Sequence, residues 1–110
     1  MANNFRNDIT SGLGTSLTSI YTAGSGVTAT VIGMTCANTT SSDVTVTITV
    51  TDTSASATAN VVKNAPVPTG GSLVVAGGNH KIVLETGDIL KAQSSASSSI
   101  DIMLSVLEQT

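Results

Sequence analysis

One segment of this chain alternates strictly between apolar and hydroxyl-bearing residues, and this pattern constrains the fold more than any other feature. In residues 43–52, DVTVTITVTD, the side chains of Val44, Val46, Ile48 and Val50 share one side of an extended chain, and threonines share the other. A period of two is typical of a β-strand with one face in a core. The segment therefore predicts a strand whose threonine face lies in solvent or against a second subunit.

A second segment near the C-terminus, residues 99–108 (SIDIMLSVLE), repeats this alternation. The side that we expect to face the core carries Ile100, Ile102, Leu104 and Val106. The opposite side is partly apolar as well, because Met103 and Leu107 lie there among polar residues. We therefore expect the second side of this strand to be covered too.

The composition extends the β prediction to the whole chain. Of the 110 residues, 18 are Thr and 15 are Ser, and no segment has a helical period with caps. Branched side chains favour the extended backbone. Further strands are expected at residues 17–21, 27–38, 57–67, 73–75, 80–85 and 88–93. Seven or eight short antiparallel strands at this spacing predict an all-β protein, a single β-sandwich or small jelly roll.

Two local features refine this arrangement. Gly33 interrupts the strand expected at 27–38, where a glycine often marks a bulge or a close contact. Pro66 and Pro68 end the strand expected at 57–67, and proline places that end at a sheet edge or a crossover because it has no backbone donor.

The first twelve residues differ in composition from the rest. We expect residues 1–12 to form an extended N-terminal arm and residues 13–110 to form the sandwich domain. Phe5 and Ile9 are the large apolar residues of the arm, and their even spacing puts both on one side of an extended chain. We expect them to be interface anchors that dock on a neighbouring subunit. The alternative is that the arm folds back as an extra edge strand of its own sandwich.

Charge and aromatic content exclude several classes of partner. The formal net charge is −3, and the four cations, Arg6, Lys63, Lys81 and Lys91, are scattered singly. Binding to a nucleic acid backbone needs clustered cations, and two aromatic residues cannot build stacking platforms. No stretch approaches the roughly 20 apolar residues of a membrane helix. We expect no nucleic-acid or membrane partner, and no secretory signal is visible at the N-terminus.

Candidates for chemistry are few. His80 is the single histidine and Cys36 the single cysteine, so neither a Ser-His-Asp arrangement nor a four-ligand zinc site is favoured. Cys36 is expected to be a small buried hydrophobe. Glu85 and Asp88 flank a Thr-Gly turn, where they either hold a calcium ion or only solvate the turn. The second interpretation is preferred, and we expect no enzyme activity, no catalytic residue and no cofactor.

A longer stretch resembles a known group of proteins. Residues 64–107 contain Val67-Pro68, then Leu73-Val74-Val75, then a Lys81-to-Asp88 hairpin segment KIVLETGD, and the closing run continues as Ser105-Val106-Leu107-Glu108. This order resembles the C-terminal half of small virion proteins of tailed phages, those of cyanobacteria in particular. The earlier segments SLTSIYTA and ANTTSSDVTVTITVTD fit the same frame, so the resemblance covers most of the chain after residue 13.

The resemblance implies a non-enzymatic structural protein located in the virion and made in the host cytoplasm. It favours a capsid decoration (cement) protein that stabilises the phage head through contacts with the major capsid protein or other virion subunits. It also implies a homo-oligomer, with a trimer favoured. A neck or tail component is the alternative, and a carbohydrate- or receptor-binding sandwich module is a further one.

Overall fold

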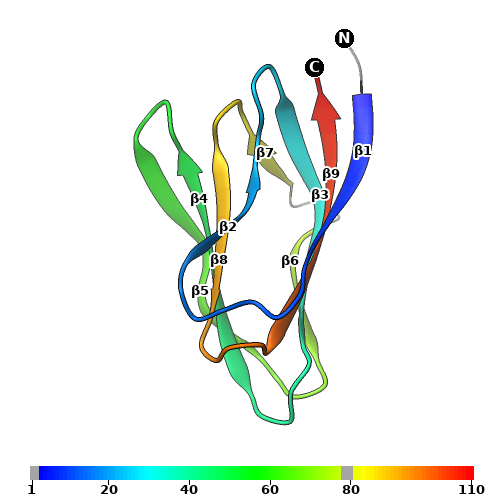
Figure 1. Cartoon of the computed structure of the whole chain (residues 1–110), viewed down its shortest axis with the longest axis vertical. Coiled ribbons are helices and arrows are strands. Elements are labelled where there is room, and N and C mark those ends of the chain that lie inside the picture. The colour runs from blue at the N-terminus through cyan, green and yellow to red at the C-terminus, as the bar shows by residue number, and fades with distance from the viewer. Residues whose placement is uncertain (1–2, 78–80) are drawn as a thin grey trace.

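Two antiparallel sheets pack face to face in the computed structural model, which describes residues 3–77 and 81–110 (Figure 1). The described residues form strands and no helix. The strands are β1 (Asn3–Thr10), β2 (Thr18–Thr22), β3 (Thr28–Asn38), β4 (Val44–Asp52), β5 (Ala57–Val67), β6 (Ser72–Ala76), β7 (Ile82–Leu84), β8 (Ile89–Ser94) and β9 (Ile100–Gln109). The all-β sandwich expected from the alternating segments is confirmed.

The order of strands places the two alternating segments inside their sheets. The first sheet, here called sheet A, has the order β1-β9-β3, and both β6 and β7 pair with the other side of the long strand β3. The second, sheet B, has the order β2-β8-β4-β5. Strands β9 and β4 therefore have a paired neighbour on both sides, and one face of each packs against the opposite sheet.

The core lies between the sheets and is built from the residues that the alternation selects. Val44, Val46 and Ile48 of β4 are buried, while Val50 at the end of the same face is half-buried. The four residues of β9 that were expected to face inward are all at most 1% exposed: Ile100, Ile102, Leu104 and Val106. Such burial of branched side chains is the main favourable contribution to folding.

The local features predicted for glycine and proline are also present. The pairing of β3 with β9 shifts register between Val31 and Gly33, so a bulge interrupts β3 there. Strand β5 lies at the edge of sheet B and contains Pro66 opposite Thr45 of β4. An edge position suits this proline because the missing donor then needs no second partner.

The N-terminal segment is arranged differently from the arm expected for residues 1–12. Residues 3–10 form β1, which pairs with β9 of the same chain from Asn3 opposite Gln109 to Thr10 opposite Ile102. The segment is thus an edge strand of its own sandwich and accounts for the ninth strand. The physical reason is that β1 supplies hydrogen-bond partners to the backbone of β9, which would otherwise be open on that side.

The boundary at residue 12 does not separate two parts of the fold. Leu13 is buried in the core, and its backbone N–H donates a hydrogen bond to the carbonyl of Ile100 over 2.8 Å.

Within the described residues, no helix is long and apolar enough to cross a membrane.

Candidate functional site

The side of sheet A that faces away from sheet B carries an unusual number of exposed apolar side chains. We call it the outer face of sheet A. More than half of each of five large side chains is accessible there, with Phe5 the most exposed at 76%. The five are Phe5 and Ile9 of β1, Met103 of β9, Val74 of β6 and Val83 of β7.

The strand register aligns these side chains in two rows across the sheet. The first row is Ile9, Met103, Thr35 and Val74. The second row is Phe5, Leu107, Thr30 and Val83. Side chains that stand directly opposite on neighbouring strands have Cβ atoms about 4.5–5.5 Å apart. Each row is therefore a continuous apolar ridge, with threonine methyl groups contributed by β3.

The outer face of sheet A has very little charge. Among its described strand positions, Asp101 at the start of β9 is the one ionisable residue. Its carboxylate accepts hydrogen bonds from the Gly12 backbone N–H (2.9 Å) and the Ser11 hydroxyl (3.4 Å). A shallow depression of about 390 Å³ lies beside it, lined by Ile9, Thr35, Ala37, Asp101, Ile102 and Met103. Few charges mean a small desolvation cost when such a surface is covered.

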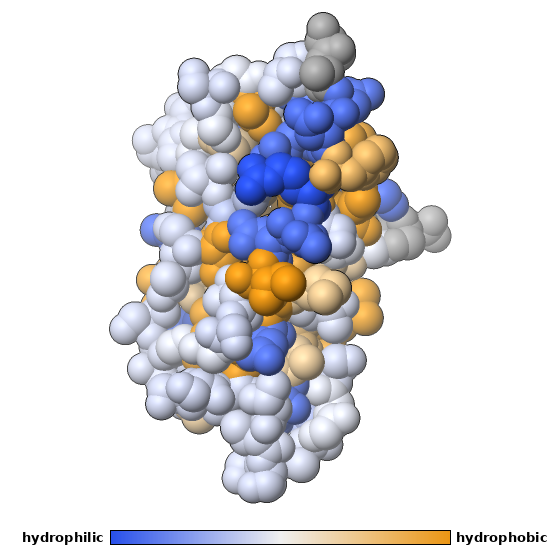
Figure 2. Space-filling view, turned by 45° about the vertical axis from the view of Figure 1, so that its right-hand side comes forward, coloured by the Kyte–Doolittle hydropathy of each residue, from blue (hydrophilic) through white to orange (hydrophobic). Residues whose placement is uncertain are grey.

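The outer face of sheet B provides a contrast within the same molecule. Its central strand β4 presents Thr45, Thr47 and Thr51, and the neighbouring strand β8 presents Lys91 and Gln93. This face is hydroxyl-rich and suited to water, whereas sheet A exposes hydrophobic groups. Figure 2, which brings the β1 side forward, shows hydrophobic groups interleaved with strongly hydrophilic ones on the surface.

Phe5 and Ile9 thus lie where they can contact another molecule, on one side of β1 as their spacing predicted. Val74 and Val83 join them on the same face, although the sequence did not single them out. Both belong to short strands, three residues in β7 and five in β6. In such short apolar runs the sequence does not reveal which side chain points outward.

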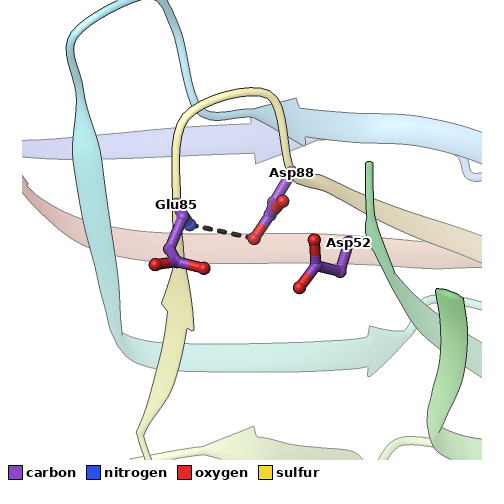
Figure 3. Close-up of side chains that lie close together, drawn as sticks. All are labelled: Asp52, Glu85 and Asp88. Atoms are coloured by element: carbon purple, nitrogen blue, oxygen red, sulfur yellow. Dashed lines mark hydrogen bonds between the residues drawn. The ribbon is translucent and has the colours of Figure 1, made fainter. Parts of the chain in front are cut away.

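The acidic residues at the turn after β7 have a structural role. Asp52 joins Glu85 and Asp88, so that one carboxylate oxygen of each lies within 4.8 Å of the others (Figure 3). Asp88 is buried, and its carboxylate accepts the backbone N–H of Glu85 over 3.0 Å and that of Thr53 over 3.4 Å. These bonds fix the turn and bring it to the end of β4.

Asp52 is similarly engaged at its own turn. Its carboxylate accepts the Ser54 hydroxyl (2.8 Å) and the Ala55 backbone N–H (3.1 Å), and these hydrogen bonds lower the pKa of Asp52. Two of the three acids therefore act as acceptors for turn backbone. The geometry favours the turn interpretation of Glu85 and Asp88 over a calcium site.

Cys36 and His80 are the remaining candidates from the sequence. Cys36 is fully buried, and burial raises the pKa of its thiol to about 12, so a reactive thiolate is disfavoured at neutral pH. It behaves as the small buried hydrophobe that its apolar surroundings predicted. His80 lies outside the described residues.

Comparison of the chain with models of protein families, with curated proteins and with solved structures finds no match. The outer face of sheet A has therefore to be interpreted from its own chemistry.

Proposed function

We propose that this protein is a non-enzymatic structural subunit, which functions by forming interfaces with other protein chains. The observation that carries the proposal is the outer face of sheet A, whose described strand positions include five exposed large apolar side chains and a single charged residue. Monomeric proteins rarely expose contiguous apolar patches of this kind, and such patches mark interaction sites.

The resemblance of residues 64–107 to small phage virion proteins directs the proposal to a specific assembly. The protein is a virion component, and its most favoured role is a capsid decoration (cement) protein on the phage head. Its partner on the head is the major capsid protein, contacted through the outer face of sheet A. A low charge density supports this role, because broad surfaces of the chain become interfaces at little desolvation cost.

A direct test measures the chain in purified particles of the phage whose genome encodes it. A decoration protein is present at a copy number comparable to that of the major capsid protein, whereas a neck or tail component is present at a much lower one. Absence of the chain from purified particles would overturn the virion proposal.

A second measurement tests the face. Particles stripped of the chain are incubated with the purified protein, and occupancy is quantified after sedimentation. The double variant Met103→Ser, Val74→Ser removes apolar contacts from the centre of the outer face of sheet A and is expected to lower occupancy at least tenfold. The matched control is Thr45→Ser with Thr51→Ser on the outer face of sheet B, which should leave occupancy unchanged. The reverse result would assign the contact to sheet B.

A further inference from the structure

Strand β1 leaves one side of sheet A open to another strand. It is the last strand of the sheet, and among the described residues its second side has no neighbour. The alternate backbone N–H and C=O groups of an eight-residue strand are therefore available for pairing.

The other long edge strand, β5, has features that discourage such pairing, and β1 lacks them. Strand β5 carries Lys63 and Pro66, and its pairing with β4 is interrupted by register shifts. Lysine, proline, bulges and inward-pointing charges are the usual protections of an exposed sheet edge, and of these β1 has only the inward-pointing charges of Arg6 and Asp8. Strand β1 pairs with β9 in an unbroken register and contains neither lysine nor proline. Its edge is regular enough to add a strand.

The polarity of β1 limits which strand it accepts. Its inward positions carry Arg6 and Asp8, opposite the buried Val106 and Leu104 of β9. The Asp8 side chain is half-buried, and it has no hydrogen-bond or ion-pair partner among the described residues. An apolar strand added here would place its side chains beside these charges, at a desolvation cost. The edge therefore favours a strand with charges in complementary positions.

The sequence of β1 is itself such a strand. Around Asn7 the order is apolar, cationic, Asn, anionic, apolar: Phe5, Arg6, Asn7, Asp8 and Ile9. We propose that β1 pairs antiparallel with β1 of a second copy of this chain, in the register centred on Asn7. In this register Phe5 stands opposite Ile9 of the partner subunit, and Arg6 stands opposite Asp8 of the partner subunit.

The two-fold axis at Asn7 makes each contact away from the axis occur twice in this register. Two Phe5–Ile9 pairs lie on the outer face of sheet A, and two Arg6–Asp8 pairs lie on the inner side. Opposed side chains in an antiparallel pair have Cβ atoms about 4.5–5.5 Å apart, which brings both kinds of pair into contact. Arg6 already lies 3.3 Å from Glu108, and its guanidinium retains further N–H donors for Asp8 of the partner subunit.

The neighbouring registers are unfavourable. A shift of two residues is the smallest that keeps the same faces together. In one direction it places Arg6 opposite Arg6 of the partner subunit, and in the other it places Asp8 opposite Asp8 of the partner subunit. Like charges directly opposite each other destabilise a sheet. The charges thus select one register, and an isologous contact of this kind closes as a dimer. This differs from the trimer that the resemblance implies, and it does not depend on the virion role.

Sedimentation of the full-length chain tests the proposal through the charges. A contact between two strands is small, so a micromolar dissociation constant is expected and loading from about 1 to 500 µM is needed. The chain should approach twice its mass of 11.0 kDa at the higher concentrations. Arg6→Asp alone and Asp8→Arg alone should each weaken the dimer at least tenfold, because each places like charges opposite at two positions.

Rescue distinguishes pairing from a general loss of structure. The double variant Arg6→Asp, Asp8→Arg restores opposite charges across the axis and should dimerise like the original chain. Each single variant should form a weak homodimer, whereas a mixture of the two should form a heterodimer in which the opposed residues carry opposite charges. Glu108→Gln removes the ion pair of Arg6 within the chain but changes no residue of β1, so it should leave dimerisation unchanged.

Cysteine cross-linking tests the register. Asn7→Cys puts the two thiols opposite each other at the axis, within the range that a disulfide spans. The matched control is Asn3→Cys, at an outward position of the same strand, whose thiols would be eight residues apart along the ladder, about 27 Å. Mild oxidation should link the first variant and not the second, and the natural Cys36 is buried and does not compete. The proposal would be overturned if the chain stays monomeric or forms a trimer. It would also be overturned if the charge changes do not affect association, or if both cysteine variants cross-link equally.

Discussion

The hydroxyl of Tyr21 donates a hydrogen bond to the carboxylate of Glu108, and this bond joins the two sheets because Tyr21 is in β2 and Glu108 is in β9. The same carboxylate lies 3.3 Å from the guanidinium of Arg6 in β1. Glu108 thus connects three strands along one side of the sandwich, where both β1 and β2 are edge strands. Contacts of this kind link the edges of the two sheets by polar groups as well as by the apolar core.

Replacing Tyr21 by Phe should lower the free energy of unfolding by about 1–2 kcal/mol, since the lost bond has a charged acceptor in a partly buried place. Urea unfolding at neutral pH measures the change. Glu108→Gln serves as the control, because it keeps a neutral acceptor for the hydroxyl and loses the charge of that acceptor and the ion pair with Arg6, so it should cost less than Tyr21→Phe. A Tyr21→Phe variant as stable as the original would show that the bond contributes nothing.

Stability should decline at alkaline pH for two identifiable reasons. Burial raises the pKa of the Cys36 thiol from 9.0 to about 12, and burial, followed by the hydrogen bond and charge of Glu108, raises the pKa of the Tyr21 hydroxyl from 10.0. In both cases the folded chain holds a proton that the unfolded chain releases. The stability they contribute is complete below about pH 9 and is lost as pH rises through the folded-state pKa values.

Unfolding free energies measured from about pH 8 to 11 check this expectation. Each group that titrates only in the unfolded chain gives a slope of about 1.4 kcal/mol per pH unit. The decline should begin near pH 9 in the original chain and about one unit higher in Cys36→Ala. Identical pH profiles of the two proteins would contradict the assignment to Cys36.

Truncation in the core should be costly at the centre of either sheet. Ile48 and Leu104 are at most 1% exposed, so Ile48→Ala or Leu104→Ala should each reduce stability by about 2–5 kcal/mol. Met103→Ala, one residue from Leu104 but 56% exposed, should change stability by less than about 0.5 kcal/mol. Chemical denaturation of the three variants decides this, and a large loss for Met103→Ala alone would mean that the two faces of β9 are reversed.

The buried carboxylate of Asp88 should matter to folding more than its exposed neighbour. Asp88→Ala leaves the backbone N–H of Glu85 without its acceptor, which costs about 1–3 kcal/mol. Glu85→Ala removes an exposed carboxylate and should be nearly neutral. Thermal unfolding with and without millimolar calcium completes the test. A rise in melting temperature on adding calcium, abolished by either substitution, would reinstate a cation site at this turn.

Deletion of residues 2–12 should destabilise the isolated domain, because β1 pairs with residues 102–109 of β9. A loss of several degrees in melting temperature is expected. Phe5→Ser is the control, since it changes an exposed side chain and keeps the strand. A truncated domain with an unchanged melting temperature would show that the segment is dispensable for folding and would favour a tether to another subunit.

How well each strand could be predicted depends on the length of its apolar alternation and on which side of the alternation faces the core. In β4 and β9 the alternation is long and its apolar side faces the core, so both strands and their buried residues could be recognised. In β1 the alternation is reversed, because Phe5 and Ile9 face outward and Arg6 and Asp8 face the sandwich. The segment therefore looked like an arm, and nothing local indicates that it pairs with residues 102–109 at the other end of the chain.

The candidate sites show the same limit. The pair Glu85 and Asp88 is visible locally, but Asp52 reaches it from a different hairpin. The outer face of sheet A unites five strands that are separate in sequence, so its apolar rows exist only once the register is fixed. Phe5 and Ile9 could be singled out in the sequence because they are isolated apolar groups in a polar segment, whereas Val74 and Val83 lie in short apolar runs.

The order of strands in sheet A has a consequence for biosynthesis. Strand β9 is the last of the nine strands to leave the ribosome, yet in sheet A it lies between β1 and β3 and pairs with both. Before β9 emerges, β1 has no partner in its own chain and β3 has an open side, so the nascent chain cannot close this sheet progressively. Sheet A can therefore be completed only after β9 has been synthesised, and until then its unpaired strands stay open to contacts with other chains.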